Sequence, residues 1–271
     1  MTSTARTVSL ITTLLGALIL AAVFTSAALP AVGSLLAGDR EASTASGGIH
    51  TAAVDDVTTL YVDSRSSDVH VAFGDVPEAQ LSVSPADSNA WHWTSAGNAL
   101  IATNERPFYN ICFGWCGNEN EEVTITLPEE LDGKLSGDFT LGSGRVTAEG
   151  DFTNLDLDVS AGTLTYTGEV EEVTTDLSGG STNLELTNTR VADLEVAAGR
   201  FTAELDGRAP ERVRAELSAG ELNLTLPDVP FQVRTEHTFG ILDNQLRTAP
   251  DADHLIDIEV VAGRALLQHA E

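Results

Sequence analysis

The sequence is poor in basic residues. Lysine and arginine together number 14 against 41 aspartates and glutamates, and Lys134 is the single lysine. The resulting net charge of −27 at pH 7 repels phosphate backbones and anionic headgroups, so nucleic-acid binding and electrostatic docking to a membrane are excluded. This charge does not imply disorder, because 42% of the residues are hydrophobic and recur in a regular pattern.

Signatures of catalysis are missing as well. The sequence contains no phosphate-binding glycine loop, nucleophile elbow or zinc motif, and its six histidines are scattered without ligand spacing. The acidic residues are spread evenly instead of forming a carboxylate pair beside aromatic side chains, as glycoside hydrolysis requires. We therefore expect no enzyme activity and no cofactor, and a polysaccharide-processing β-helix enzyme is the distant alternative.

Long apolar runs are limited to one segment near the N-terminus. Val8 to Leu29 spans 22 residues without a charge, enough for a helix that crosses a bilayer. Arg6 precedes the segment and acidic residues follow it, which orients the C-terminus outward. We expect residues 1–36 to form a membrane anchor or signal segment, and residues 37–50, rich in Ala, Ser, Thr and Gly, to form a flexible tether.

A cleaved signal peptide is the alternative for the same segment. Thr25 and Ala27 would be the small residues at its cleavage site. In both cases the remaining chain is exported. The expected location is the cell membrane, with a single span and the C-terminal domain outside the cytoplasm.

Only two cysteines are present, Cys112 and Cys116, in the segment Ile111–Gly117. Outside the cytoplasm a pair this close forms a local disulfide that staples a turn. Unpaired structural thiols are the alternative. A metal site would need further ligands at finger spacing, and a redox pair would prefer a two-residue gap. We expect a structural disulfide.

A glycine-marked repeat organises the rest of the chain. Its copies are separated by 18, 18, 19, 21, 20 and 23 residues, and hydrophobicity around each one alternates with period two, as in strands. Glycine permits the backbone angles of a tight corner between two strands. The repeat glycines are Gly144, Gly162, Gly180, Gly199, Gly220, Gly240 and Gly263.

Rows counted from these glycines predict which side chains face inward. The row three residues before the glycine holds Leu141, Val159, Leu177, Val196, Leu217, His237 and Val260. The row two residues after it holds Val146, Leu164, Thr182, Phe201, Leu222, Leu242 and Ala265. His237 is therefore expected to be a hydrogen-bonded core histidine.

A unit of about 20 residues cannot bury its own apolar face, but stacking successive copies does so. The sequence predicts an all-β fold, a parallel β-solenoid over residues 131–271 whose coils lie about 4.8 Å apart. An antiparallel β-sandwich is the alternative. Residues 51–130 carry the repeat poorly and are expected to form an atypical cap that contains the cysteine pair. Trp91 and Trp93 in this region indicate either cap packing or an exposed binding platform.

One polar row stands out, four residues before each glycine. Because it alternates with the inward rows, it should point outward and stack as a ladder of six carboxylates. Like charges on neighbouring strands are unfavourable. Screening by salt, pairing of Arg214 and Arg234 with neighbouring glutamates, or bridging by Ca²⁺ or Mg²⁺ would offset the repulsion. The ladder consists of Asp158, Asp176, Glu195, Glu216, Glu236 and Glu259.

The segment Val123–Leu131 followed by the glycine repeats resembles the putative-adhesin family of β-strand-repeat domains. The likeness is clearest from Val123 to Pro227, while the cysteine loop and the copies at Gly240 and Gly263 depart from the simplest pattern. The resemblance implies a membrane-anchored or exported β-solenoid of the prokaryotic cell envelope. Together with the acidic row it suggests a non-enzymatic surface protein that binds an envelope protein, a glycan or a wall polymer. An envelope-stress sensor or accessory protein is the alternative.

Overall fold

The computed structural model describes residues 43–45, 49–84, 91–104 and 121–270. All of them belong to one compact unit, residues 41–271. The expected anchor, residues 1–36, and the pair Cys112 and Cys116 lie outside the described residues. Within the described ranges, no helix is long and apolar enough to cross a membrane.

The described chain is all-β. One short 3-10 turn, η2 (Glu129–Leu131), accompanies the strands. The strands are β1 (Ser43–Ala45), β2 (Ile49–Ala52), β3 (Thr59–Ser64), β4 (Asp68–Gly74), β5 (Ala79–Ser84), β6 (Trp91–Ala96), β7 (Ala99–Asn104), β8 (Glu122–Pro128), β9 (Ser136–Leu141), β10 (Arg145–Glu149), β11 (Phe152–Val159), β12 (Thr163–Leu177), β13 (Ser181–Thr187), β14 (Val191–Val196), β15 (Arg200–Asp206), β16 (Arg212–Leu217), β17 (Glu221–Leu226), β18 (Gln232–His237), β19 (Ile241–Asn244), β20 (Leu255–Val260) and β21 (Arg264–His269).

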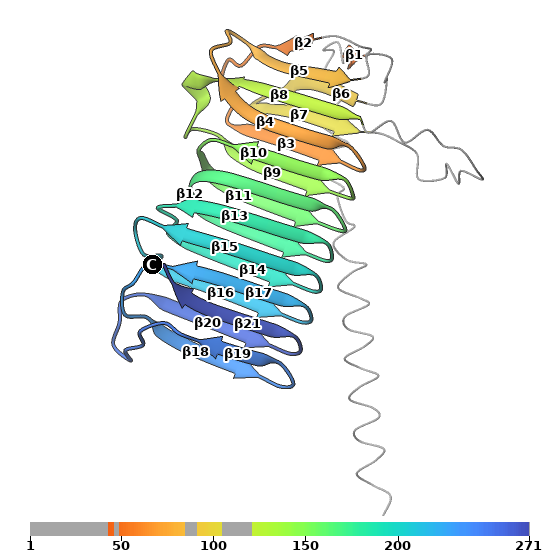
Figure 1. Cartoon of the computed structure of the whole chain (residues 1–271). Helices are drawn as coiled ribbons and strands as arrows, with labels where there is room; N and C mark the ends of the chain where they lie inside the picture. Colours follow the sequence, from red (N-terminus) through yellow and green to blue (C-terminus); the bar gives the residue numbers. More distant parts are fainter. Residues whose placement is uncertain (1–42, 46–48, 85–90, 105–120, 271) are drawn as a thin grey trace, which may run out of the picture. The chain divides into compact units, whose positions relative to one another are not determined.

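The strands form two long ladders, here named sheet A and sheet B (Figure 1). Sheet A has the order β1-β6-β7-β3-β9-β11-β12-β14-β16-β20-β18. Sheet B has the order β2-β5-β8-β4-β10-β12-β13-β15-β17-β21-β19. A strand of sheet A and the following strand of sheet B, joined at a corner, form one rung. The long strand β12 serves both sheets.

Pairing between the repeat strands is parallel throughout. Antiparallel pairs are confined, in the described chain, to β1–β6, β6–β7, β2–β5 and β5–β8, all of which precede Glu129. Residues 43–45 and 49–50, part of the expected tether, are therefore strand residues. The hairpins that a sandwich built from the repeat would require are replaced by rungs that stack directly on one another.

The inward rows form the core between the two sheets, as the alternation predicted. Leu164 and Val196 are fully buried, and so is Leu222. Equivalent residues of successive rungs stand directly opposite each other, as Leu157 does with Phe139. Each rung thus covers the apolar side chains of the next, and the predicted inward orientation of these rows is confirmed.

The repeat glycines form a ladder at one corner of the stack. Gly180, Gly199 and Gly220 have φ angles of 88°, 107° and 109°, a region that side chains with a Cβ rarely adopt. A Cβ on Gly199 would lie 2.4 Å from the carbonyl oxygen of Gly180. That oxygen accepts a hydrogen bond of 3.0 Å from the amide of Arg200. Glycine is required here because the backbones of adjacent rungs approach so closely.

The order of the last two rungs differs from the order in the sequence. Rung β20–β21 follows β16–β17 directly, and rung β18–β19 pairs with the far side of β20–β21. The chain therefore moves out to the end of the stack and then returns to insert its last rung. The prediction that the copies at Gly240 and Gly263 stack in the order of the sequence is therefore wrong.

This insertion also explains why the prediction of a core position for His237 is wrong. The side chain lies in an inward row but is exposed, as is that of Thr235. Rung β18–β19 is the terminal one, so among the described residues no further rung covers its inner side. A core histidine is excluded.

A second insertion occurs near the other end. β3 pairs with both β7 and β9, and β4 pairs with both β8 and β10. Residues 59–74 therefore form a parallel rung inside the stack, although they lack the glycine motif. Their corner, Ser64–Ser67, takes the place of the glycine turn, and a Cβ on Gly144 would lie 2.5 Å from the carbonyl oxygen of Ser67.

Candidate functional site

The outer face of sheet A carries two aligned columns of polar side chains. The first, here named the acidic column, runs Asp63, Thr140, Asp158, Asp176, Glu195, Glu216, Glu259, Glu236. The second column runs Tyr61, Asp138, Asp156, Thr174, Asp193, Arg214, Asp257, Arg234. All six carboxylates of the predicted ladder lie in the first column. Their order is changed, because Glu259 stands between Glu216 and Glu236.

The parallel register brings like charges close together at the N-terminal part of this face. Burial raises the pKa of Asp138 to about 6, with further contributions from the negative charges of Asp156, Asp158 and Asp63. Burial also raises the pKa values of five further carboxyl groups, and neighbouring carboxylates add to the shift in three of them. These groups are Asp63, Asp156, Asp158, Asp176 and Glu195.

This crowding predicts a pH-dependent stability. The folded state holds a proton on Asp138 up to about pH 6, whereas an unfolded aspartate releases it near pH 3.9. The free energy of unfolding therefore falls as pH rises through this window and stays lower above it. Lowering the pH from 7 to 5 should raise the melting temperature by about 1–3 °C, since partial exposure reduces the effect.

Asp138→Asn is the variant that tests the source of this pH effect. It should raise the melting temperature at pH 7 and reduce the difference between pH 5 and pH 7. Asp193→Asn is the matched control, because Asp193 lies in the same column but opposite Arg214. An equal response of the two variants in thermal denaturation would contradict the assignment to Asp138.

The C-terminal part of the face is mixed in charge. Arg214 forms an ion pair with Glu216, as the sequence suggested, whereas no described residue forms an ion pair with Arg234. A shallow groove of about 500 Å³ runs over this region and is lined by Arg212, Arg214, Arg234, Glu216, Glu236, Asp257 and Glu259. A smaller groove of about 290 Å³ lies over the N-terminal part and is lined by Tyr61, Asp138, Asp156, Glu172 and neighbouring residues.

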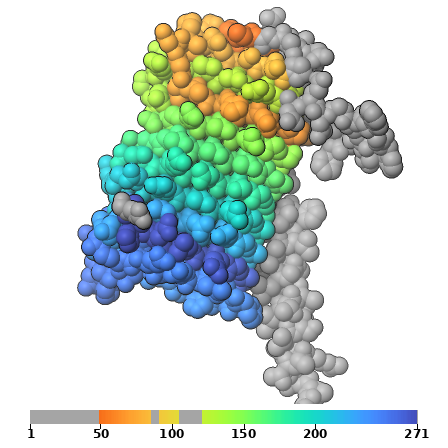
Figure 2. Space-filling view, viewed as in Figure 1, coloured from red at the N-terminus to blue at the C-terminus, as the bar shows by residue number. Residues whose placement is uncertain are grey.

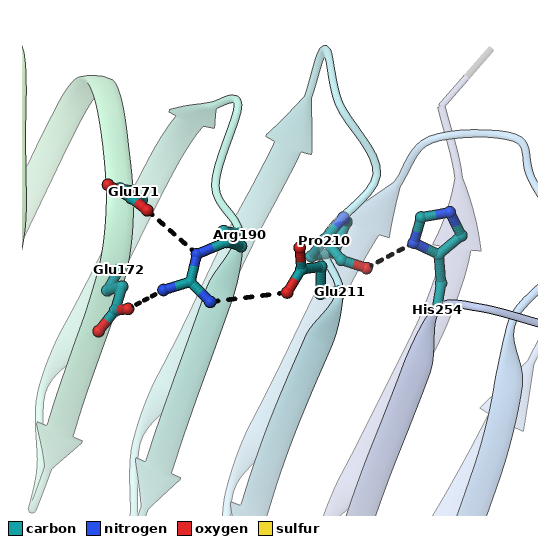
Figure 3. Close-up of polar contacts among 6 residues, drawn as sticks. All are labelled: Glu171, Glu172, Arg190, Pro210, Glu211 and His254. Atoms are coloured by element: carbon teal, nitrogen blue, oxygen red, sulfur yellow. Dashed lines mark hydrogen bonds and ion pairs between the residues drawn. The ribbon is translucent and has the colours of Figure 1, made fainter.

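The sequence analysis did not identify a third set of charged residues, which surrounds Arg190. Arg190 lies between three glutamates of neighbouring rungs, Glu171, Glu172 and Glu211 (Figure 3). The Nε atom of Arg190 is 3.1 Å from Glu171 Oε1, and its Nη1 atom is 3.6 Å from Glu211 Oε2. The sequence does contain a pattern that predicts this set, because Glu171, Arg190 and Glu211 each precede their repeat glycine by nine residues. The same row continues to His254, whose Nδ1 lies 2.9 Å from the carbonyl oxygen of Pro210.

Trp91 and Trp93 do not form an exposed platform. Trp91 and Trp93 are 0% and 1% exposed. The indole Nε1 of Trp91 donates to Glu121 Oε2 at 2.9 Å, and the Ser67 hydroxyl and the Asn104 amide donate to the same oxygen at 2.6 and 3.0 Å. A buried carboxylate with several donors holds neighbouring strands together. Of the two interpretations of Trp91 and Trp93, packing inside the N-terminal region is therefore the correct one.

The carboxylate columns do not form a metal site of recognisable geometry. In the described ranges, no group of three or more His, Cys, Asp or Glu side chains could hold a metal ion. Bridging of neighbouring carboxylates by Ca²⁺ or Mg²⁺ therefore stays a prediction. The arrangement presents negative charges at the spacing of the strands, about 4.8 Å.

Comparison with known proteins supports the fold. No protein-family model matches the chain, and no curated protein matches it in sequence. Among solved structures, a putative adhesin from Bacteroides fragilis has a TM-score of 0.50 and 13% identity, over 82% of this chain and 96% of that chain. A putative cell adhesion protein from Clostridium sporogenes has a TM-score of 0.34 and 9% identity, over 82% of this chain and 98% of that one. A putative lipid binding protein from Parabacteroides distasonis has a TM-score of 0.41 and 12% identity, over 83% of this chain and 96% of that chain. The likeness to the Bacteroides protein agrees with the resemblance to the putative-adhesin family seen in the repeats, and the two proteins share their fold.

Proposed function

We propose that this chain is a non-enzymatic β-solenoid protein of the cell envelope that binds a partner through the outer face of sheet A. Residues 1–36 would anchor it in the membrane, with the stack outside the cytoplasm. The partner would be an envelope protein, a glycan or a wall polymer. An envelope-stress sensor or accessory protein is the alternative, which would use the same face for a regulatory partner.

The observation that carries this proposal is the alignment of carboxyl groups from successive rungs in two columns on one face of sheet A. Burial raises the pKa values of Asp138, Asp156 and Asp158, and neighbouring carboxylates raise them further. A sequence that favoured stability alone would place threonine at these outward-facing strand positions, because it has a high β-propensity and adds no like-charge repulsion. Features that oppose stability in this way are expected where a protein performs its function.

The outer face of sheet B provides the contrast. From β10 to β17 its central row consists of Thr147, Thr165, Asn183, Thr202 and Asn223, which carry no charge. Carboxylates in two adjacent columns therefore characterise sheet A, whereas the glutamates of sheet B lie in a column to one side of this uncharged row. A positively charged surface, or a cation shared with an anionic polymer, would bind there and return the carboxyl groups to their ordinary pKa.

The test is capture of envelope components by the full chain and by a neutralised variant. Asp156→Asn, Asp158→Asn and Asp176→Asn together remove three adjacent charges from sheet A, and we expect capture to fall by about tenfold or more. The matched control removes three charges from one column of sheet B, with Glu149→Gln, Glu185→Gln and Glu204→Gln. The net charge changes equally in both, so a loss of capture in both variants, or in neither, contradicts the proposal.

A chelator distinguishes the two kinds of partner in the same experiment. Capture that survives chelation indicates direct contact with a cationic partner. Capture that is lost on chelation and returns with Ca²⁺ or Mg²⁺ indicates a bridged anionic glycan or polymer.

A further inference from the structure

The terminal rung β18–β19 has two open edges. β18 pairs with β20 and β19 pairs with β21, and no other described strand pairs with either. Phe231, the residue directly before β18, is bridged by Thr248 of the connection after β19, so the edge of β18 is open from Gln232 onward. At the opposite end, β1, β2, β5 and β6 add antiparallel strands to the parallel rungs (Figure 1). An open strand edge presents unpaired N–H and C=O groups that another chain can pair with.

The side chains of this rung are unusually exposed for their rows. Val233 and Leu242 are only partly buried, although the same rows are buried in most rungs. Phe239 and Ile241, at the corner and just after it, are 86% and 57% exposed. Figure 2 shows this blue end of the stack opposite the orange strands, with the rung at its surface. Apolar surface at an open edge points to a partner that covers it.

Backbone hydrogen bonds show which groups of β18 are available. The amide of Gln232 donates to the carbonyl of His254 at 2.7 Å, and that of Thr238 donates to Val260 at 3.0 Å. Even-numbered residues therefore direct their backbone groups toward β20. Because this direction alternates along a strand, Val233, Thr235 and His237 direct theirs to the open edge.

The charges of β18 select how a second copy would pair with it. Antiparallel pairing centred on Arg234 would oppose two arginines, and pairing centred on Glu236 would oppose two glutamates. Pairing centred on Thr235 instead sets Arg234 opposite Glu236 of the second copy, twice. Opposite charges across a strand pair stabilise it and like charges destabilise it.

The backbone agrees with the register centred on Thr235. The two Thr235 residues then form a hydrogen-bonded pair through the groups that face the open edge. The two Arg–Glu pairs fall at the non-hydrogen-bonded positions, where side chains are closest. Within one chain Glu236 lies beside Glu259, so an arginine from the second copy would also relieve the repulsion at the end of the acidic column.

We propose that two copies of this chain form a two-fold symmetric dimer through the open edge of rung β18–β19, with β18 antiparallel to β18 about Thr235. A two-fold axis perpendicular to the sheets rotates both strands of the rung together, so β19 meets β19 of the second copy in the same way. The dimer is one continuous stack with a cap at each end. It does not depend on what binds to sheet A.

Sedimentation equilibrium of the full chain, in a density-matched detergent, tests the dimer. The unmodified chain should show a concentration-dependent dimer mass. Arg234→Glu should weaken the dimer by about tenfold or more, since two attractive pairs become repulsive. Glu236→Arg alone should weaken it similarly, which provides a second variant if one of them folds poorly. The double variant R234E/E236R restores opposite charges and should return the dissociation constant to near its original value.

Arg212→Glu is the matched control, because Arg212 is exposed on the same face of sheet A but lies on an interior rung, on β16. Its dimer should match that of the unmodified chain. A monomer at every concentration overturns the proposal. A dimer that survives Arg234→Glu, or that the charge-swapped double variant fails to restore, overturns it as well, because the interface would then lie elsewhere.

Discussion

Gly199→Ala is expected to lower the free energy of unfolding by about 3 kcal/mol or more. The φ angle of Gly199 is 107°, which strains any residue with a Cβ. The new Cβ would also lie 2.4 Å from the carbonyl oxygen of Gly180 and 3.1 Å from its amide nitrogen. Neither atom can move freely, because that carbonyl bonds to Arg200 within the ladder. Urea denaturation monitored by circular dichroism measures the loss.

The matched control for this substitution is Gly97→Ala. Gly97 also has a positive φ angle, 62°, but a Cβ there would meet no atom within 4 Å. The expected loss is about 1 kcal/mol, from backbone conformation alone. Similar losses for the two variants would show that the rungs do not approach each other closely at the glycine corner.

Phe152→Ala is expected to lower the free energy of unfolding by about 3–5 kcal/mol. Phe152 is 2% exposed and packs between aromatic side chains of three other strands. Its ring centroid is 5.6 Å from that of Phe73, 5.8 Å from that of Phe139 and 6.1 Å from that of Tyr166. The cavity left by truncation would loosen several rungs at once. Denaturant unfolding with an unchanged slope would show that stability, and not compactness, has changed.

The same chemical change at an exposed position serves as the control. Phe239 is 86% exposed, so Phe239→Ala should change stability by less than about 0.5 kcal/mol, measured at a protein concentration where the chain is monomeric. A loss at Phe239 comparable to that at Phe152 would mean that the terminal corner is buried within the monomer.

The tyrosine beside Phe152 connects the core to the backbone of the corner opposite the glycines. The Tyr166 hydroxyl donates to the carbonyl oxygen of Gly150 at 2.7 Å. Burial raises the pKa of Tyr166, and the nearby charges of Asp151 and Asp132 raise it further. The hydroxyl is therefore protonated at neutral pH and acts as a hydrogen-bond donor there.

The two proposals use different parts of the molecule. Binding depends on the carboxylates near Asp138 to Asp176, in the N-terminal and central part of sheet A, whereas dimerisation depends on β18. In the dimer the acidic columns of the two copies meet at their Arg234–Glu236 ends. Neutralising sheet A should leave the dimer intact, and disrupting β18 should leave the face of each monomer intact, so each proposal can fail without the other.

Much of this arrangement could be predicted from the sequence, because alternation and the glycine spacing are local properties. The period-two pattern separates inward from outward rows, and a repeat of about 20 residues places Leu164, Val196 and Leu222 in the core. The same spacing aligned Asp158, Asp176 and Glu195 in one column. The row of Arg190 could have been found by the same count.

What the sequence by itself determined was the content of each rung: which side chains face the core, where the corner glycines stand, and which charges share a column. Only the tertiary structure decided the order of the rungs. A repeat motif specifies how a rung fits a neighbour but not which neighbour, since all rungs present nearly the same apolar face. The connection of residues 245–254 before β20, and the strands β5 to β8 that intervene between β4 and β9, allow the chain to skip a position. Therefore β3–β4 and β20–β21 lie inside the stack, and β18–β19, with the exposed His237, lies at its end.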